Sequence, residues 1–223
     1  MSSKTISRQR PPALKDARGK VLEVGFGTGL NLPCYPAAVT QLVVVDPEDL
    51  MPKRVAARIS AAPFPVTRVT LSAERLPLED DSFDCAVSTF TLCTIPDASA
   101  ALHEVRRVLK RDGRFLFLEH GLSEEPSVAK WQRRLNPIQR RIGRGCTLDR
   151  RIDSLISDAG LKITRLDRFL IPGMPRTHGT MYRGIAAARE RIEPDVSKEL
   201  PFESPLKARQ DDVTHGRAAI RST

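Results

Sequence analysis

The chain is poor in the features that mark membrane-spanning, disulfide-stabilised and base-stacking proteins. Its apolar runs are short, since Leu42–Val45 stops at Asp46, whereas a spanning helix needs about 20 apolar residues. Four cysteines stand without a CxxC pair or a histidine at ligand spacing, so we expect neither a disulfide framework nor a metal site. Aromatic residues make up only 5% of the chain, few for stacking on single-stranded bases.

Acidic residues are outnumbered, and the formal net charge of the 223 residues is +9. The excess of positive charge is concentrated in residues 1–20 and 130–151. The second segment contains eight basic residues and one acidic residue, Asp149. Such segments are either solvated surface or anion-binding surface. Because 130–151 also carries Trp131 and Leu135, a peripheral contact with an anionic membrane through an amphipathic helix is one hypothesis, although Pro137 is expected to interrupt that helix.

We predict one domain with irregular ends. Residues 1–18 are polar and contain Pro11 and Pro12, which favours a flexible basic arm. They do not resemble a secretory signal, so we expect a cytoplasmic protein. Association with the membrane surface is compatible with this expectation. Residues 19–188 form the predicted domain. Residues 189–223 are charged and rich in proline, which predicts a disordered tail.

Short apolar runs alternate with helix-compatible segments along the predicted domain. Runs of four or five apolar residues bounded by turn residues are typical of parallel strands covered by helices on both faces. We expect one helix from Asp97 to Lys110, ended by Asp112 and Gly113, and another over residues 147–160. The predicted fold is α/β, a doubly wound, mostly parallel seven-stranded sheet, with strands at 20–24, 41–45, 66–71, 83–88, 114–118, 161–166 and 180–187.

A glycine loop directly follows the first predicted strand. Gly25, Gly27 and Gly29 stand at alternate positions, where the backbone can approach a ligand closely. The dinucleotide fingerprint would need glycine or alanine at Leu30, and the carboxylate of Glu23 would repel a pyrophosphate. The loop therefore predicts an adenosine-like ligand without phosphates.

Asp46 strengthens this prediction, because it ends the second strand. An acidic side chain at that position can accept hydrogen bonds from both hydroxyls of a ribose.

These features together resemble the class I S-adenosylmethionine-dependent methyltransferases over roughly residues 20–187. The resemblance implies a Rossmann-like fold and S-adenosylmethionine as cofactor, with the methionine part held by Glu23 and the glycine loop, the ribose by Asp46 and the adenine by Ala73 and Glu74. The family often has Asp where Ser72 stands. The cofactor-binding residues that it implies are Glu23, Val24, Gly25, Phe26, Gly27, Thr28, Gly29, Asp46, Pro47, Ala73, Glu74 and Thr89.

Motifs in the second half are similar to the branch that contains membrane-associated alkyl-thiol methyltransferases. They lie at 91–94, 117–120, 131–137 and 145–150. Bacterial lipid and quinone methyltransferases share much of this pattern. The expected acceptor is therefore a small or lipophilic molecule attacked at S, O or N, meaning a thiol, a quinol or phenol, or an amine.

Methyl transfer from a sulfonium is an in-line displacement, so alignment and exclusion of water matter most. For a thiol or phenol, His120 after the fifth strand is the candidate base, and Glu119 can orient either His120 or an amine. Cys93 and Cys146 are expected to be packed thiols.

Two other functions stay open at this stage. One is a non-enzymatic or RNA-directed protein that binds an adenosine ligand, although few aromatics and no Asn-Pro-Pro-Tyr-like run after the fourth strand speak against nucleic acid. The other is a nicotinamide-dependent oxidoreductase, which Leu30 and Glu23 disfavour.

Overall fold

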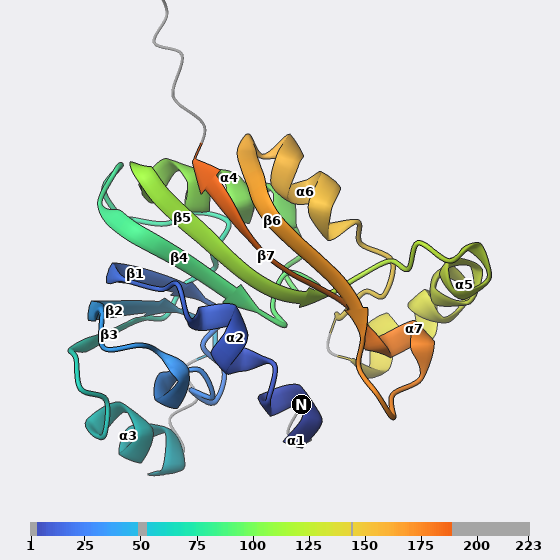
Figure 1. The fold of residues 1–223 in the computed structure, drawn as a ribbon, viewed down its shortest axis with the longest axis horizontal. Helices are drawn as coiled ribbons and strands as arrows, with labels where there is room; N and C mark the ends of the chain where they lie inside the picture. The colour runs from blue at the N-terminus through green and yellow to red at the C-terminus, as the bar shows by residue number, and fades with distance from the viewer. Residues whose placement is uncertain (1–3, 49–52, 144, 189–223) are drawn as a thin grey trace, which may run out of the picture. The chain divides into compact units, whose positions relative to one another are not determined.

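The computed structural model describes residues 4–48, 53–143 and 145–188. Its centre is a seven-stranded sheet in the order β3-β2-β1-β4-β5-β7-β6, in which β7 runs antiparallel to its neighbours (Figure 1). This confirms the predicted α/β class with a mostly parallel sheet. The strands are β1 Gly19–Val24, β2 Val39–Val45, β3 Val66–Val69, β4 Phe83–Thr89, β5 Leu109–His120, β6 Leu161–Leu170 and β7 Thr180–Ala188.

Both faces of the sheet are buried, which explains the continuous apolar runs. Successive side chains of a strand point to opposite faces. Val21 and Leu42 pack in one hydrophobic cluster, whereas their neighbours Leu22 and Val43 pack in the other.

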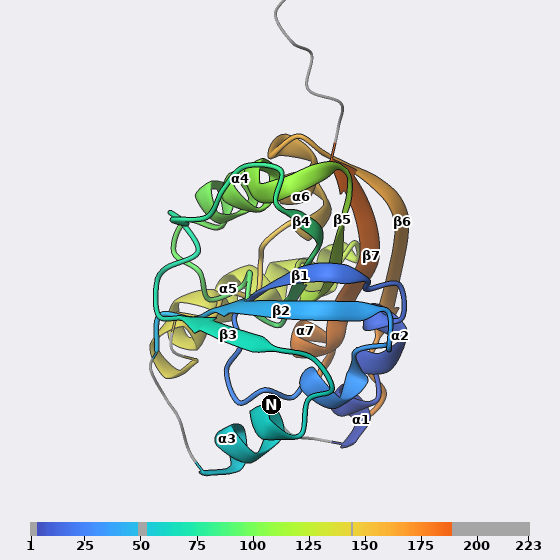
Figure 2. The same ribbon diagram turned by 90° about the vertical axis from the view of Figure 1, so that its left-hand side faces the viewer.

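Helices cover each face (Figure 2). One cluster includes α4 Ala98–Val108 and α6 Ile152–Asp158, and the other includes α2 Arg10–Leu14, the 3-10 turn η1 Leu32–Cys34 and α3 Lys53–Ser60. None of the helices in the described ranges is both long and apolar enough to cross a membrane.

The helix after β4 begins as predicted, because the Asp97 carboxylate accepts a hydrogen bond from the Ala100 backbone N–H at 2.9 Å. Its predicted end is wrong. α4 stops at Val108, and β5 starts at the next residue, so Asp112 and Gly113 lie inside a strand. Pairing with β4 explains the early stop, since Leu109 is already in register with Phe83.

α6 is shorter than the predicted 147–160 and begins at Ile152. The preceding residues make tertiary contacts instead: the N–H of Thr147 donates to the Cys93 carbonyl at 2.9 Å, and that of Leu148 donates to Asn136. Gly160, at φ +82°, follows the helix as predicted.

The prediction of a flexible arm over 1–18 is wrong for the described part of that segment. Residues Lys4–Ser7 form α1 and Arg10–Leu14 form α2. The apolar side chains Ile6, Ala13 and Leu14 of these helices are buried, and so is Ala17, three residues after α2. Pro11 and Pro12 do not exclude a helix, because proline is tolerated in the first turn, where the N–H groups have no helical partner. The predicted tail, 189–223, lies outside the described residues.

α5, Pro126–Ile142, runs through Pro137, so the predicted interruption is wrong. Two side-chain amides, the buried Gln132 and the half-buried Asn136, hold the helix from its inner side. Gln132 Nε2 donates to the carbonyls of Gly121 and Thr177 at 2.9 and 3.0 Å, the second of these on α7 Arg176–Gly179. Asn136, directly before the proline, binds Asp149 and Leu148.

Candidate active site

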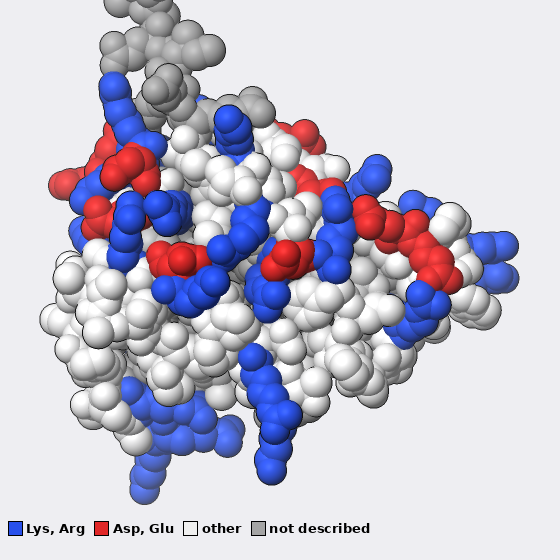
Figure 3. Space-filling model, viewed as in Figure 1, with Lys and Arg blue, Asp and Glu red and all other residues white. Residues whose placement is uncertain are grey.

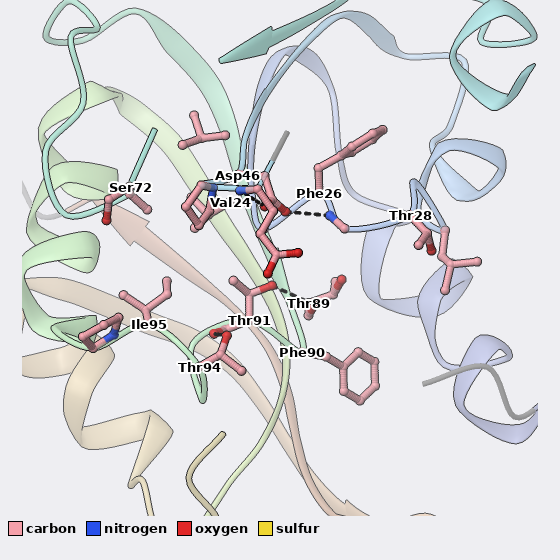
Figure 4. A pocket seen from close by; sticks show the side chains of 18 of the residues that line it. Val24, Phe26, Thr28, Asp46, Ser72, Thr89, Phe90, Thr91, Thr94 and Ile95 are labelled. Atoms are coloured by element: carbon pink, nitrogen blue, oxygen red, sulfur yellow. Dashed lines mark hydrogen bonds between the residues drawn. The ribbon is translucent and has the colours of Figure 1, made fainter. Parts of the chain in front are cut away.

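The carboxyl ends of β1, β2 and β4 meet at one edge of the sheet and surround a cavity of about 490 Å³ (Figure 4). A crevice at this edge is where open α/β sheets bind their ligands. The wall residues come from the glycine loop, the end of β2, the loop after β3, the loop after β4 and α2: Arg10, Val24–Thr28, Leu30, Val45–Glu48, Ser72, Ala73, Thr89–Thr91 and Thr94–Pro96.

The glycine loop can only take its path with glycines. Gly25 and Gly27 have φ values of +78° and +53°, a region that side chains disfavour. A Cβ on Gly25 would lie 2.1 Å from the Thr91 hydroxyl oxygen, whereas a Cβ on Gly27 would meet nothing within 4 Å. The loop is therefore packed against the β4 loop at Gly25 and open at Gly27.

Asp46 is fixed beside this loop. One carboxylate oxygen accepts a hydrogen bond from the Gly27 N–H at 2.8 Å, and the other accepts one from the Glu48 N–H at 2.9 Å. Asp46 and Pro47 both line the cavity. The structure thus brings together the predicted ribose-binding carboxylate and the predicted loop.

Glu23 does not line the cavity but lies beneath it, 1% exposed. Its carboxylate accepts hydrogen bonds from the Tyr35 hydroxyl at 2.9 Å and from Asn31 Nδ2 at 2.8 Å. Burial raises the pKa of Glu23 to about 7, against the opposing effect of these hydrogen bonds. The prediction that Glu23 touches the ligand is replaced by a role in the polar layer under the cavity.

Arg10 completes this polar layer and was not among the predicted site residues. Its guanidinium donates to Asn31 Oδ1 at 2.6 Å and to Thr89 Oγ1 at 2.8 Å, and lies 5.2 Å from the ring centre of Phe90. Burial lowers the pKa of Arg10. The signal that predicts it is the helical spacing of Ile6, Arg10, Ala13 and Ala17.

The loop after β4 forms the opposite wall of the cavity. Phe90 takes a φ of +57°, unusual for a bulky residue, and thereby turns the chain at the end of β4. Thr91, Thr94 and Ile95 project toward the cavity (Figure 4). Their position after the fourth strand indicated this wall, although we named none of them as site residues.

Glu119 holds this loop from below and is itself fully buried. It accepts hydrogen bonds from the Ser88 hydroxyl at 2.6 Å and from the Thr91 backbone N–H at 2.9 Å. Burial raises its pKa. Glu119 does not line the cavity, so the structure gives no contact through which it would act on a substrate directly.

His120 does not line the cavity either. It is 3% exposed, and its Nε2 lies 3.0 Å from the sulfur of Cys146, which in turn lies 3.6 Å from the sulfur of Cys93. Hydrogen bonding with Cys93 and His120 lowers the pKa of the Cys146 thiol, and hydrogen bonding with Cys146 raises the pKa of Cys93. The predicted catalytic base is thus turned toward two thiols.

The remaining predicted residues divide in two groups. Val24, Phe26, Thr28, Ala73 and Thr89 line the cavity. Gly29 and Glu74 do not: Gly29 packs against Phe26 and Leu32, and Glu74 accepts the Asp97 N–H at 2.7 Å.

Comparison with known proteins agrees with this geometry. A family model described as a methyltransferase domain matches residues 22–117. The thiol S-methyltransferase TMT1B of Rattus norvegicus is 35% identical over 147 residues, covering 61% of this chain and 59% of the relative. The chain belongs to the S-adenosylmethionine-dependent methyltransferase family.

Another methyltransferase relative is the ubiquinone/menaquinone biosynthesis C-methyltransferase UbiE of Bartonella quintana, 38% identical over 54% of this chain and 47% of the relative. The present chain thus spans about half to three fifths of the length of these two relatives. Among solved structures, the YcgJ protein from Bacillus subtilis shares the fold, with a TM-score of 0.62 at 19% identity over 83% of this chain and 98% of that one. These findings do not favour the nicotinamide alternative.

Proposed function

We propose that this methyltransferase binds S-adenosylmethionine in the cavity and transfers its methyl group to a small, lipophilic acceptor. The observation that carries the proposal is the pairing of Gly27 with Asp46. A loop that is open on the Gly27 side leaves room for a ligand backbone, and a carboxylate fixed beside it at the cavity wall suits the two hydroxyls of a ribose.

The other contacts of the cofactor follow from the cavity wall. Ser72, Ala73 and Gly25–Thr28 line the cavity, and we assign the first two to the adenine and the glycine loop to the methionine part. When bound, the cofactor would supply a methyl group on a sulfonium: an electron pair of the acceptor would attack the methyl carbon, the carbon–sulfur bond would break, and S-adenosylhomocysteine would leave as a neutral thioether. Arg10, Asn31 and Glu23 hold the loop from below.

The acceptor would meet the wall formed by residues 90–96, which contains no charged residue. A neutral or apolar acceptor fits this wall better than a charged one, because an unpaired charge loses hydration there. Among the named relatives one acts on thiols and one serves ubiquinone/menaquinone biosynthesis, and both acceptor classes are compatible with a neutral wall. We propose a thiol or a quinol as the acceptor.

Catalysis on this account rests on alignment rather than on a base. Glu119 acts as a positioning residue, since its carboxylate fixes the Thr91 N–H and hence the acceptor wall. His120 acts on the same wall through Cys146 and Cys93.

A peripheral contact with an anionic membrane, through 130–151, belongs to the same proposal. α5 contains five basic residues and no acidic one, and its basic residues are exposed: Lys130, Arg133, Arg134, Arg140 and Arg141. Trp131, Ile138 and Ile142 are 57, 61 and 76% exposed, and spacings of seven and eleven residues place them on one stripe. Blue side chains mark the α5 end of the molecule (Figure 3). The apolar stripe and the basic residues beside it on α5 together suit the surface of an anionic membrane.

Mass spectrometry with a deuterated-methyl cofactor tests the function. The purified protein is incubated with an alkyl thiol, a quinol and an aminolipid, and the product that gains the labelled methyl group identifies the attacked atom. We expect transfer to the thiol or quinol. Binding of the cofactor without transfer to any of the three would instead favour the non-enzymatic adenosine-binding function.

A further inference from the structure

Two cysteines and a histidine from three distant segments meet beside the acceptor wall. Cys93 lies in the loop after β4, His120 ends β5, and Cys146 lies in the loop after α5. Their exposed fractions are 0, 3 and 5%, and their ligand atoms all lie within 4.8 Å of one another. We propose that Cys93, His120 and Cys146 form a binding site for a thiophilic divalent cation of the zinc type.

The distances suit tetrahedral coordination. At a Zn–S distance of about 2.3 Å, two sulfur ligands of a tetrahedral site are separated by about 3.8 Å. The two sulfurs of Cys93 and Cys146 lie 3.6 Å apart, close to that value and far from the roughly 2.05 Å of a disulfide. His120 Nε2 lies 3.0 Å from Cys146 Sγ, about half an ångström closer than the roughly 3.6 Å between nitrogen and sulfur ligands of a tetrahedral zinc, so a small shift of the imidazole brings all three atoms around one cation.

Hydrogen bonding alone does not account for the buried histidine. Nδ1 of His120 has no hydrogen-bond partner among the described residues, and Nε2 faces only sulfur, which is a weak acceptor. A buried polar ring needs stronger compensation than this. A cation bound by Nε2 supplies it at that nitrogen, while Nδ1 keeps no partner among the described residues.

The loops that carry the sulfurs are tied to each other, so the donors are held in place. The N–H and hydroxyl of Thr147 donate to the Cys93 carbonyl at 2.9 and 3.1 Å. Arg150 Nη2 donates to the Ile95 carbonyl at 2.6 Å, which fixes the other side of the Cys93 loop. Such outer contacts orient metal ligands in known sites.

Three protein donors leave one position of a tetrahedral cation for water or an exogenous ligand. Each thiol that binds as thiolate releases one proton to solvent. The absence of a CxxC pair, which led us to expect no metal, does not bear on this site, because its ligands are 26 to 53 residues apart in the chain.

Titration of the reduced full-length protein with Co²⁺ tests the site. We expect one Co²⁺ per chain, with a thiolate-to-cobalt charge-transfer band and tetrahedral d–d bands that Zn²⁺ abolishes. Cys93→Ser and Cys146→Ser are each expected to weaken binding at least about tenfold. Cys85→Ser is the matched control, since Cys85 is equally buried but packs in the other hydrophobic cluster. Spectra that are absent, or that persist in Cys146→Ser, would overturn the proposal.

A second measurement needs no variant and covers the case in which the serine variants do not fold. Zn²⁺ is expected to slow alkylation of Cys93 and Cys146 in the native protein, followed residue by residue by mass spectrometry, and to leave Cys34 unchanged. Equal alkylation rates with and without Zn²⁺ contradict the site. Both readouts are independent of cofactor binding and of methyl transfer.

Discussion

Arg10 connects the N-terminal helix to the cavity wall through single hydrogen bonds. Its guanidinium binds Asn31 and Thr89, and its charge favours the ionised form of Glu23. Removing it leaves the buried Asn31 Oδ1 without this donor and takes one of two donors from Thr89 Oγ1, which costs on the order of 2 kcal/mol. We expect Arg10→Ala to lower the free energy of unfolding by about that amount and to weaken binding of S-adenosylhomocysteine about tenfold.

Urea denaturation and calorimetric titration check this expectation. Arg8→Ala is the matched control, because Arg8 lies one half-turn earlier and is exposed. Equal behaviour of the two variants would show that Arg10 does not support the cavity.

Glu23 makes stability depend on pH. Its pKa is about 7 in the folded chain, against 4.5 for an unperturbed Glu, so the folded state holds its proton more tightly than the unfolded state. The stabilisation is complete below pH 4.5 and is lost as the pH rises through 7. From pH 5 to 7 this lowers the free energy of unfolding by about 2 kcal/mol.

The variant Glu23→Gln cannot titrate at this position, so its free energy of unfolding should fall less over the same interval. Urea denaturation of both proteins at pH 5, 6 and 7 measures the difference. Parallel pH profiles would mean that Glu23 keeps an ordinary pKa.

At the scale of elements, α2 is part of the folded domain. Leu14 is fully buried in the cluster that includes Val21 and Leu42. Truncation of a buried leucine costs about 3 kcal/mol. We therefore expect Leu14→Ala to lower the free energy of unfolding by about that amount, and Leu71→Ala, at a residue 42% exposed, to change it by less than about 1 kcal/mol. A flexible N-terminal segment would leave both variants close to the parent protein.

The exposed stripe of α5 predicts binding to anionic vesicles. Trp131 is the single tryptophan of the chain, so a blue shift of its emission reports directly on this helix. We expect the shift with vesicles that contain anionic phospholipid, weaker binding at high salt, and loss of binding in Ile138→Glu.

Leu170→Glu is the matched control for that variant, because Leu170 is a comparably exposed apolar residue, 43% exposed, at the end of β6. If Ile138→Glu binds vesicles as well as Leu170→Glu and the parent protein do, the apolar stripe of α5 does not carry the binding.

At the scale of the whole molecule, local patterns predicted the sheet and half of the site. Strands β1 and β2 are each a short, mainly apolar run in the sequence, one leading into Gly25 and the other ending at Asp46. Parallel pairing of the two strands therefore brings Gly25 and Asp46 close together. Arg10, Thr91 and the cluster around Cys146 come from segments brought together only by tertiary packing. Spacing along the chain carries no signal for such contacts.

Tertiary contacts also explain why two predicted helix boundaries were wrong. Pro137 predicts a break, yet side-chain amides hold α5 before the proline through Gln132 and Asn136 and after it through Gln139. Asp112 and Gly113 predict a helix end, yet pairing between β4 and β5 begins before them. In each case a local preference of a few kcal/mol is outweighed by packing.

The proposed function requires that the cavity at Gly27 and Asp46 binds the cofactor of a methyltransferase. Calorimetric titration with S-adenosylhomocysteine tests it most directly, with Asp46→Ala beside the parent protein and with Asp112→Ala, an exposed carboxylate at the opposite end of the sheet, as control. The account predicts micromolar binding by the parent and the control, at least about tenfold weaker binding by Asp46→Ala, and none of NAD. Equal affinity in Asp46→Ala, or binding of NAD in preference, would contradict it.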